Sequence, residues 1–198
     1  MIFAFLAGAY LLGAIPTGYI ITKLVKGVDI RSCGSGNSGA TNVFRTAGTA
    51  AGIMTFAIDV LKGFLPVFLA VQYFSDAQAI FWILTGICAI AGHMWTIFLK
   101  FRGGKGVATA AGVFAALLPL GTLCAFALFA GVVFITRYVS LGSIIAAVFL
   151  SAYSWYSGAP FAISLFASIT ALAIVFKHKK NIERLASGTE NKFGAKKQ

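Results

Sequence analysis

Glycines and hydrogen-bonding side chains are concentrated in one short stretch of a chain that is otherwise mostly apolar. The stretch reads Gly34-Ser35-Gly36-Asn37-Ser38-Gly39-Ala40-Thr41-Asn42, and Arg45 follows it. Glycine lets the backbone turn through positive φ and come close to a ligand, and successive N–H groups that point into one concavity bind an anion. We therefore predict a phosphate-binding cradle here. Its candidate residues are Gly34, Ser35, Gly36, Asn37, Gly39, Thr41, Asn42 and Arg45.

A second glycine-rich stretch reads Gly103-Gly104-Lys105-Gly106 and carries a cation among its glycines. We predict that Lys105 supplies a point charge for a phosphate, whereas Arg45 can grip one with two hydrogen bonds. Gly103, Gly104 and Gly106 would let the phosphate approach the backbone. The alternative interpretations are flexible loops and cationic flanks of membrane spans, and we favour a flank for Lys100 and Arg102. Neither stretch is a complete nucleotide-binding motif, because no strand precedes the first and the second departs from the P-loop pattern.

A third polar stretch, residues 178–190, begins with a histidine whose titration range suits proton transfer near neutral pH. We predict catalytic roles for His178 and Asn181 and a substrate-binding role for Glu190. Ser143, two residues into a later apolar segment, is predicted to present its hydroxyl to the same membrane face. The sequence contains no Ser-His-Asp set and no cluster of metal ligands, so we expect no metal and no cofactor. The three cysteines are interpreted as free thiols.

The composition shows what must position these stretches. The chain has 198 residues, of which 59% are hydrophobic and 11% are charged, whereas a soluble domain carries about 25% charged residues. We therefore predict one all-α, polytopic membrane domain over residues 1–198, with glycine-rich loops on its cytoplasmic side. Seven transmembrane helices are predicted at about 2–22, 52–74, 79–99, 107–118, 121–136, 141–156 and 161–176.

The positions of the basic residues predict the orientation of the chain. Of its sixteen Lys and Arg residues, Lys62 alone lies within a predicted span, and the others fall in segments that this topology places in the cytoplasm. The N-terminus is then outside and the C-terminus is cytoplasmic. Residues 107–136 need two short crossings to keep Arg137 on the cytoplasmic side, with a turn at Pro119-Leu120-Gly121. Topology thereby explains the net charge of +11, and we expect no nucleic-acid partner.

Three polar side chains inside the predicted spans need a separate explanation. Asp59 and Lys62 are three residues apart, so they share one helix face and can form an ion pair. Such a pair indicates either a functional site or a structural pair that orients the loops above it, and we favour the structural one. His93 is interpreted as a packing residue in preference to a substrate ligand. The other polar clusters gather on one membrane face, which favours an enzyme over a carrier with a midplane site.

Taken together, the motifs resemble those of a membrane-enzyme family, the bacterial acyl-phosphate:glycerol-3-phosphate acyltransferases. The resemblance rests on residues 35–42, on Gly92-His93 with residues 101–109, and on residues 178–185 with Gly188-Thr189-Glu190. The Asp59-x-x-Lys62-Gly63 step and the seven-span layout are similar to that family as well. The resemblance covers essentially the whole chain.

This resemblance implies that a fatty acyl group passes from acyl phosphate to the 1-hydroxyl of glycerol 3-phosphate. The products would be lysophosphatidic acid and inorganic phosphate, formed for phospholipid biosynthesis at the bacterial cytoplasmic (inner) membrane. The donor is already activated, so no enzyme nucleophile is required. We expect Ser35, the glycine N–H groups and Lys105 to hold the acyl phosphate. The residues expected to orient glycerol 3-phosphate are Arg45, Lys105, Ser143, His178 and Asn181.

Several alternatives remain open at the level of sequence. The proton acceptor is either His178 or a phosphate oxygen of the donor. The residues alone also allow acyl-CoA or acyl-carrier protein as donor, and the resemblance favours acyl phosphate. A small membrane carrier for a phosphorylated metabolite or lipid is the alternative function, and a structural membrane subunit is a third. The expected partners are the two substrates and membrane lipid, with the oligomeric state left open.

Overall fold

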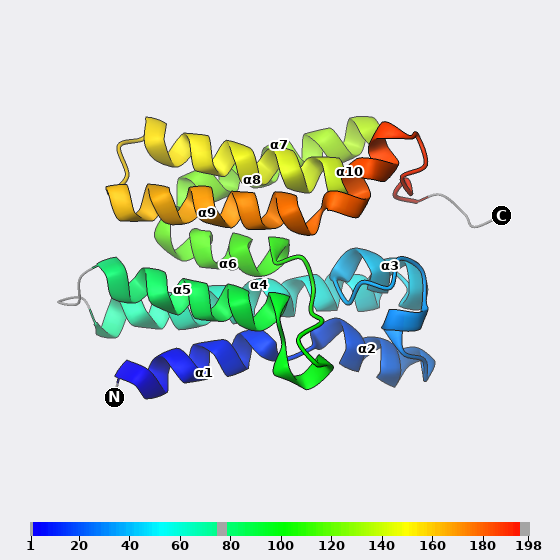
Figure 1. Cartoon of the computed structure of the whole chain (residues 1–198), viewed down its shortest axis with the longest axis horizontal. Helices are drawn as coiled ribbons and strands as arrows, with labels where there is room; N and C mark the ends of the chain where they lie inside the picture. Colours follow the sequence, from blue (N-terminus) through cyan, green and yellow to red (C-terminus); the bar gives the residue numbers. More distant parts are fainter. Residues whose placement is uncertain (1, 75–78, 195–198) are drawn as a thin grey trace. The chain divides into compact units, whose positions relative to one another are not determined.

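The computed structural model describes residues 2–74 and 79–194, and every regular element within those ranges is helical. The all-α prediction is therefore confirmed for the described part of the chain (Figure 1). The chain divides into two compact units, Met1–Leu117 and Leu118–Gln198. Each unit carries part of the predicted site.

The first unit is built on the long helix α4, which packs against α5 and α6, while α1 packs against α5. Its elements are α1 Ile2–Ala14, α2 Thr17–Lys26, η1 Ile30–Ser32, α3 Ala40–Ala47, α4 Thr49–Tyr73, α5 Ala79–Met94, η2 Ile97–Leu99 and α6 Val107–Leu117. Gly63 faces the carbonyl oxygen of Thr109, and Gly112 faces that of Val60, so a Cβ at either glycine would overlap the facing backbone. Small residues thus let α4 and α6 approach closely, as is typical of helices that pack within membranes.

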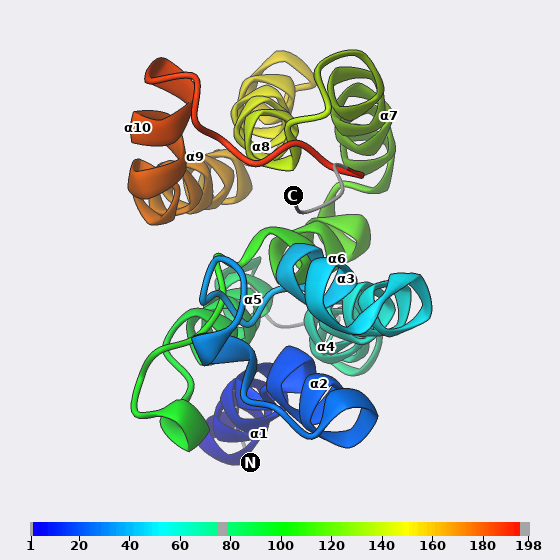
Figure 2. The same ribbon diagram turned by 90° about the vertical axis from the view of Figure 1, so that its right-hand side faces the viewer.

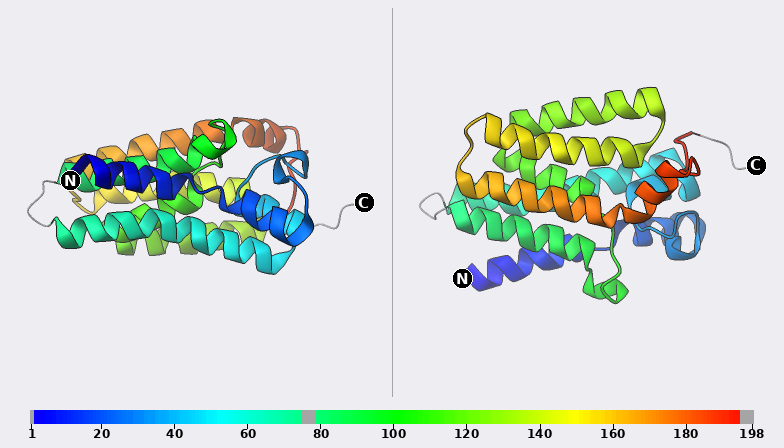
Figure 3. Two further views of the ribbon diagram at one scale, coloured as in Figure 1. Left: turned by 90° about the horizontal axis from the view of Figure 1, so that it is seen from below. Right: turned by 45° about the horizontal axis from the view of Figure 1, so that its top comes forward.

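The first predicted span, at about 2–22, lies within the apolar segment Ile2–Lys26, but its helix is interrupted, which was not predicted. α1 ends at Ala14 and α2 begins at Thr17, and the left-hand view of Figure 3 shows the two helices following one another. Pro16 lies at the break. Proline has no backbone N–H, and its ring clashes with the carbonyl one turn earlier, so a helix is broken there.

The second unit is formed by α7 Pro119–Thr136, α8 Val139–Tyr156, α9 Phe161–Lys177 and α10 Lys179–Ala186. α8 packs against both α7 and α9, and α10 is bent by 59° from α9 at His178. The segment after α10 returns past the start of α8, where the Phe193 N–H donates to the Arg137 carbonyl at 2.7 Å (Figure 2). Residues 107–136 form two helices as predicted, but their break lies at Leu118 and not at residues 119–121, because Pro119 begins α7, a position that suits proline since its missing N–H is not needed there.

Five helical segments are long and apolar enough to cross a membrane: Ile2–Lys26, Thr49–Tyr73, Ala79–Leu99, Pro119–Thr136 and Val139–Tyr156. The bent pair Phe161–Lys177 and Lys179–Ala186 passes the same test together, and Val107–Leu117 is a shorter apolar helix. These elements agree with an integral, multi-pass membrane protein. The number of seven crossings and the orientation stay predictions, and the outer turn expected near residues 75–76 lies outside the described residues.

Candidate functional site

The first glycine-rich stretch is a loop that is braced from within by one buried side chain. Asn42, only 2% exposed, donates from Nδ2 to the carbonyl oxygens of Cys33 and Asn37, each at 2.9 Å. Its Oδ1 accepts from the backbone N–H of Ser35 at 3.0 Å. Gly34 has φ +56° and lies against this amide, so it must remain a glycine. Asn42 therefore stabilises the shape of the loop, and its predicted contact with substrate stays a prediction.

Several N–H groups of this stretch are used inside the loop. Gly36 donates to the Cys33 carbonyl at 2.9 Å, and Gly39 donates to Oδ1 of Asn37 at 2.8 Å. Helix α3 then starts at Ala40 with no side chain capping its N-terminus. The first N–H groups of a helix have no partner within it, and the helix dipole favours an anion there. The stretch thus ends at an uncapped helix start, whereas the sequence predicts a loop over these residues.

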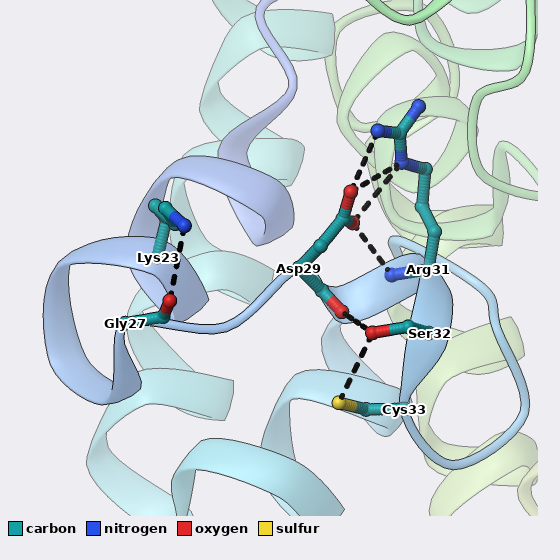
Figure 4. Close-up of polar contacts among 6 residues, drawn as sticks. All are labelled: Lys23, Gly27, Asp29, Arg31, Ser32 and Cys33. Carbon is teal, nitrogen blue, oxygen red and sulfur yellow. Dashed lines mark hydrogen bonds and ion pairs between the residues drawn. The ribbon is translucent and has the colours of Figure 1, made fainter.

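The predicted side chains of this region lie on both sides of that helix start. Ser35 is exposed on the loop, Thr41 is half-buried in the first turn of α3, and Arg45 is exposed in its last turn. The loop itself is closed at its base by Asp29 and Arg31 (Figure 4). Nη2 of Arg31 lies 2.6 Å from Oδ2 of Asp29, and the side-chain and backbone hydrogen bonds from Arg31 lower the pKa of that carboxyl.

The second glycine-rich stretch is bound to the end of α5. The N–H groups of Gly103 and Gly104 donate to the carbonyl oxygens of Met94 and His93, at 3.2 and 3.1 Å. A Cβ at Gly103 would overlap the His93 carbonyl, and one at Gly104 would overlap Nε2 of its imidazole. Both positions therefore require glycine for packing. Their N–H groups bind carbonyl oxygens of α5, whereas the sequence predicts that these glycines let a phosphate approach the backbone. Gly106, with φ +83°, precedes α6 and leaves Lys105 half-buried beside it.

A buried ion pair on α4 donates a hydrogen bond to a backbone carbonyl at the break in the first span. Nζ of Lys62 lies 2.7 Å from Oδ1 of Asp59 and donates to the Ile15 carbonyl at 3.0 Å. The Thr96 hydroxyl donates to the Ala14 carbonyl at 2.5 Å. The last carbonyls of a helix have no partner within it and attract cations. Lys62 and Thr96 therefore supply donors that the break at Pro16 removes from the helix, which supports the structural interpretation of the ion pair.

A small polar pocket opens at the same break. Its lining consists of Ala14, Ile15, Pro16, Thr17, Gly18, Ser38, Asp59, Lys62, His93 and Thr96. His93 is 8% exposed, and its Nδ1 lies 3.7 Å from Oδ1 of Asp59. None of the residues predicted to bind substrate lines this pocket. Asp59 and Lys62, three residues apart in an apolar segment, are the sequence feature that points to this pocket. Nothing in the sequence indicates that Thr96 also lines it.

In the second unit, three polar side chains, of which Asn181 was predicted, bind the buried carboxylate of Glu190. Oε1 of Glu190 accepts from the Ser140 hydroxyl at 2.8 Å and from Nδ2 of Asn181 at 2.7 Å, and Oε2 accepts from Nε of Arg184 at 2.6 Å. Burial opposes ionisation of this carboxylate, but hydrogen bonds from Asn181, Arg184 and Ser140 outweigh it and lower the pKa of Glu190. Glu190 thus joins the C-terminal segment to α8 and α10. Ser140 and Arg184 were not predicted, because no local pattern relates them to Glu190.

His178 lies at the bend between α9 and α10 and is 2% exposed. Its Nδ1 is 2.8 Å from the Ile174 carbonyl, which can only accept, so this contact assigns a proton to Nδ1. Nε2 is then the ring nitrogen that can gain a proton. The Ser143 hydroxyl donates to the Val139 carbonyl at 2.8 Å, one turn back on α8. The structure thus brings Asn181 and Glu190 into direct contact and places Ser143 and His178 in the same unit.

The geometry can be compared with known proteins. Residues 3–188 match the family model described as glycerol-3-phosphate acyltransferase. A relative of that name from Geotalea daltonii is 51% identical over 189 residues, with 94% of each chain covered. Two crystal structures of PlsY, an integral membrane glycerol 3-phosphate acyltransferase, are also similar, each at 41% identity. The glycerol 3-phosphate form has a TM-score of 0.93 with 98% of this chain and 96% of that chain covered, and the lysophosphatidic acid form has 0.90 with 98% and 95%. The chain therefore belongs to the glycerol-3-phosphate acyltransferase family.

Proposed function

We propose that this chain transfers a fatty acyl group from an acyl phosphate to the 1-hydroxyl of glycerol 3-phosphate. Lysophosphatidic acid and inorganic phosphate are the products, and phospholipid biosynthesis is the process served. Family membership over residues 3–188 supports the acceptor and the product, as do the glycerol 3-phosphate and lysophosphatidic acid forms of the solved relative. The acyl-phosphate donor rests on the resemblance of the three polar motifs.

The observation that carries this proposal is the start of α3. A glycine-rich stretch that ends at the uncapped N-terminus of a helix is suited to bind a phosphate, and both proposed substrates carry one. The stretch belongs to a chain with several membrane-crossing helices. A donor with a fatty tail can therefore keep that tail in hydrocarbon while its phosphate reaches a polar loop.

The proposed reaction needs no covalent enzyme intermediate. The glycerol 1-oxygen attacks the acyl carbon, a new C–O bond forms, and the bond from that carbon to the phosphate oxygen breaks. The hydroxyl proton passes either to Nε2 of His178 or to a phosphate oxygen. Backbone N–H groups at the start of α3, Ser35 and Lys105 stabilise negative charge on the donor. Asn181 and Ser143, with His178, act on the acceptor by fixing its orientation.

We further propose seven crossings, with the N-terminus outside and the C-terminus in the cytoplasm. α6, with eleven residues, is then a short crossing that the bundle shields from lipid. This places the catalytic residues at the cytoplasmic face of the bacterial inner membrane. The one-sided distribution of lysines and arginines in the sequence supports this orientation.

The donor is tested with purified protein in lipid, glycerol 3-phosphate, and either palmitoyl phosphate or palmitoyl-CoA. We expect phosphate release with formation of lysophosphatidic acid from the first donor, and loss of that product in Lys105→Ala. Lys26→Ala is the matched control, because Lys26 is an exposed lysine of α2 and should leave turnover unchanged. Thiol release from palmitoyl-CoA alone would overturn the donor and keep the acyltransferase.

The role of His178 is tested by His178→Gln, which removes the titrating ring. If His178 is the base, turnover is lost while glycerol 3-phosphate still binds. Loss of both turnover and binding would assign it to orientation of the acceptor and leave a phosphate oxygen as the base.

A further inference from the structure

The segment that joins α5 to the second glycine-rich stretch presents large apolar side chains to its surroundings. Trp95, Ile97, Phe98 and Phe101 are 45%, 43%, 56% and 61% exposed. Lys100 and Arg102, in the same segment, are exposed as well. Four bulky apolar groups and two cations within eight residues, 95–102, form a surface that is both apolar and positively charged.

The exposure of these side chains is imposed by a well-ordered turn. Thr96 is 2% exposed and Leu99 is 5% exposed, so both point inward. The Thr96 carbonyl accepts from the N–H groups of Leu99 and Phe101, at 3.3 and 2.8 Å, and the Arg102 N–H donates to the Leu99 carbonyl at 3.1 Å. The Tyr10 hydroxyl of α1 donates to the Trp95 carbonyl at 2.8 Å. These hydrogen bonds fix the backbone of the turn, from which the exposed side chains project.

The backbone of this turn also adopts a conformation that glycine would fill more easily. Lys100 and Phe101 have φ of 54° and 61°, in the left-handed region. A residue other than glycine in such a region is strained, and such residues cluster at functional positions. Here the left-handed positions carry a long cation and an aromatic ring, and both side chains are exposed.

We propose that residues 95–102 form an interfacial anchor, which inserts its aromatic side chains into the headgroup–acyl boundary of the bilayer and sets Lys100 and Arg102 against anionic lipid phosphates. Tryptophan and other amphipathic rings favour this depth, and basic side chains next to a membrane surface are attracted to its anionic lipids. Because residues 103–106 follow directly, the anchor holds Lys105 near the level of the lipid phosphates. The proposal concerns lipid contact and does not depend on the identity of the acyl donor.

The depth of Trp95 can be measured by fluorescence quenching. The chain has three tryptophans, and Trp82→Phe with Trp155→Phe leaves Trp95 as the single reporter. The variant is reconstituted in vesicles of phosphatidylcholine and phosphatidylglycerol whose acyl chains carry bromine either near the headgroup or near the chain end. We expect the stronger quenching from bromine near the headgroup and weak quenching by aqueous iodide.

Three results would overturn the anchor. Stronger quenching by iodide than by either lipid would place Trp95 in water, and stronger quenching by bromine at the chain end would place it in the hydrocarbon core. Protection from both lipid and iodide would mean that protein, such as a second copy of the chain, covers the turn. The same variant must retain its unfolding temperature, which confirms that the reporter is native.

The charged half of the anchor is tested by brominating one lipid at a time. Brominated phosphatidylglycerol should quench Trp95 severalfold more than brominated phosphatidylcholine at equal mole fraction. Lys100→Gln with Arg102→Gln should abolish this preference, whereas the matched pair Lys23→Gln with Lys26→Gln, which removes two exposed lysines of α2, should keep it. Equal quenching by the two lipids in the starting protein would overturn the proposed contact with anionic lipid.

Discussion

Nζ of Lys62 lies 2.7 Å from Oδ1 of Asp59, one turn earlier on α4, and both side chains are almost fully buried. The same ammonium donates to the carbonyl oxygen of Ile15 at the end of α1. One cation thus neutralises a carboxylate and satisfies an interrupted helix, so the two residues are expected to act as a unit.

Removal of the Lys62 ammonium should therefore strongly destabilise the fold. Lys62→Met leaves Asp59 buried without its counter-ion and the Ile15 carbonyl without this donor, and loss of one partner of a buried pair costs about 3–5 kcal/mol. Chemical unfolding in detergent measures the change. Asp59→Asn combined with Lys62→Met should be less destabilised than the sum of the single variants. Additive losses would show that the two groups do not interact energetically.

Gly104→Ala should displace the second glycine-rich stretch, because the added Cβ would overlap Nε2 of His93. Overpacking of this kind typically costs about 1–3 kcal/mol, and we expect turnover to fall with it. His93→Ala removes the ring, so the Gly104→Ala/His93→Ala variant should unfold at a higher temperature than Gly104→Ala alone. An unchanged unfolding temperature in Gly104→Ala would contradict this packing relationship.

Variants of Asn42 and Ser35 should distinguish a residue that holds the shape of the first glycine-rich stretch from a residue that acts on the substrate. Asn42→Asp keeps an acceptor for the Ser35 N–H but removes the Nδ2 donors to Cys33 and Asn37. We expect faster amide hydrogen exchange across residues 33–42, measured by mass spectrometry, together with loss of turnover. Ser35→Ala should lose turnover and keep the exchange of the starting protein, since the described loop contact of Ser35 is made by its backbone. Equal exchange in both variants would argue against the brace.

Glu190 predicts a dependence of stability on pH. Its pKa is lower in the folded chain than the ordinary value of about 4.5, so its ionised form stabilises the fold above that value. This contribution is lost as the pH falls below about 4.5 and through the folded pKa. Glu190→Gln should be less stable than the starting protein at neutral pH and should lose less stability between neutral and acidic pH. Parallel unfolding temperatures for the two proteins across this range would contradict the assignment.

The sequence predicted the helical segments well, because long apolar runs bounded by polar and glycine-rich stretches leave few other interpretations. It did not show the break at Pro16, because hydropathy extends over both helices of the candidate span Ile2–Lys26 and a proline alone does not mark a break, since Pro66 lies inside α4. It also failed at α3, whose eight residues lie between Gly39 and Gly48. The glycine-rich composition around that helix concealed it.

The candidate site was predictable as three motifs but not as a set of contacts. Asn42 could be recognised as a polar residue of a loop, yet its bracing role depends on the carbonyls of Cys33 and Asn37 and on the N–H of Ser35. Ser140 and Glu190 are separated by fifty positions in the chain and meet only through folding. Motifs report which residue types are present, whereas long-range hydrogen bonds decide which of them remain directed at a ligand.

The break at Pro16 has a consequence for the cation that satisfies it. In transporters with interrupted helices, the unwound carbonyls commonly hold a sodium ion that binds and leaves during each cycle. Here the ammonium of Lys62 donates to the Ile15 carbonyl at the break, and this cation is covalently part of the chain. A cation that is part of the chain cannot dissociate, so the donor that satisfies this break belongs permanently to the fold.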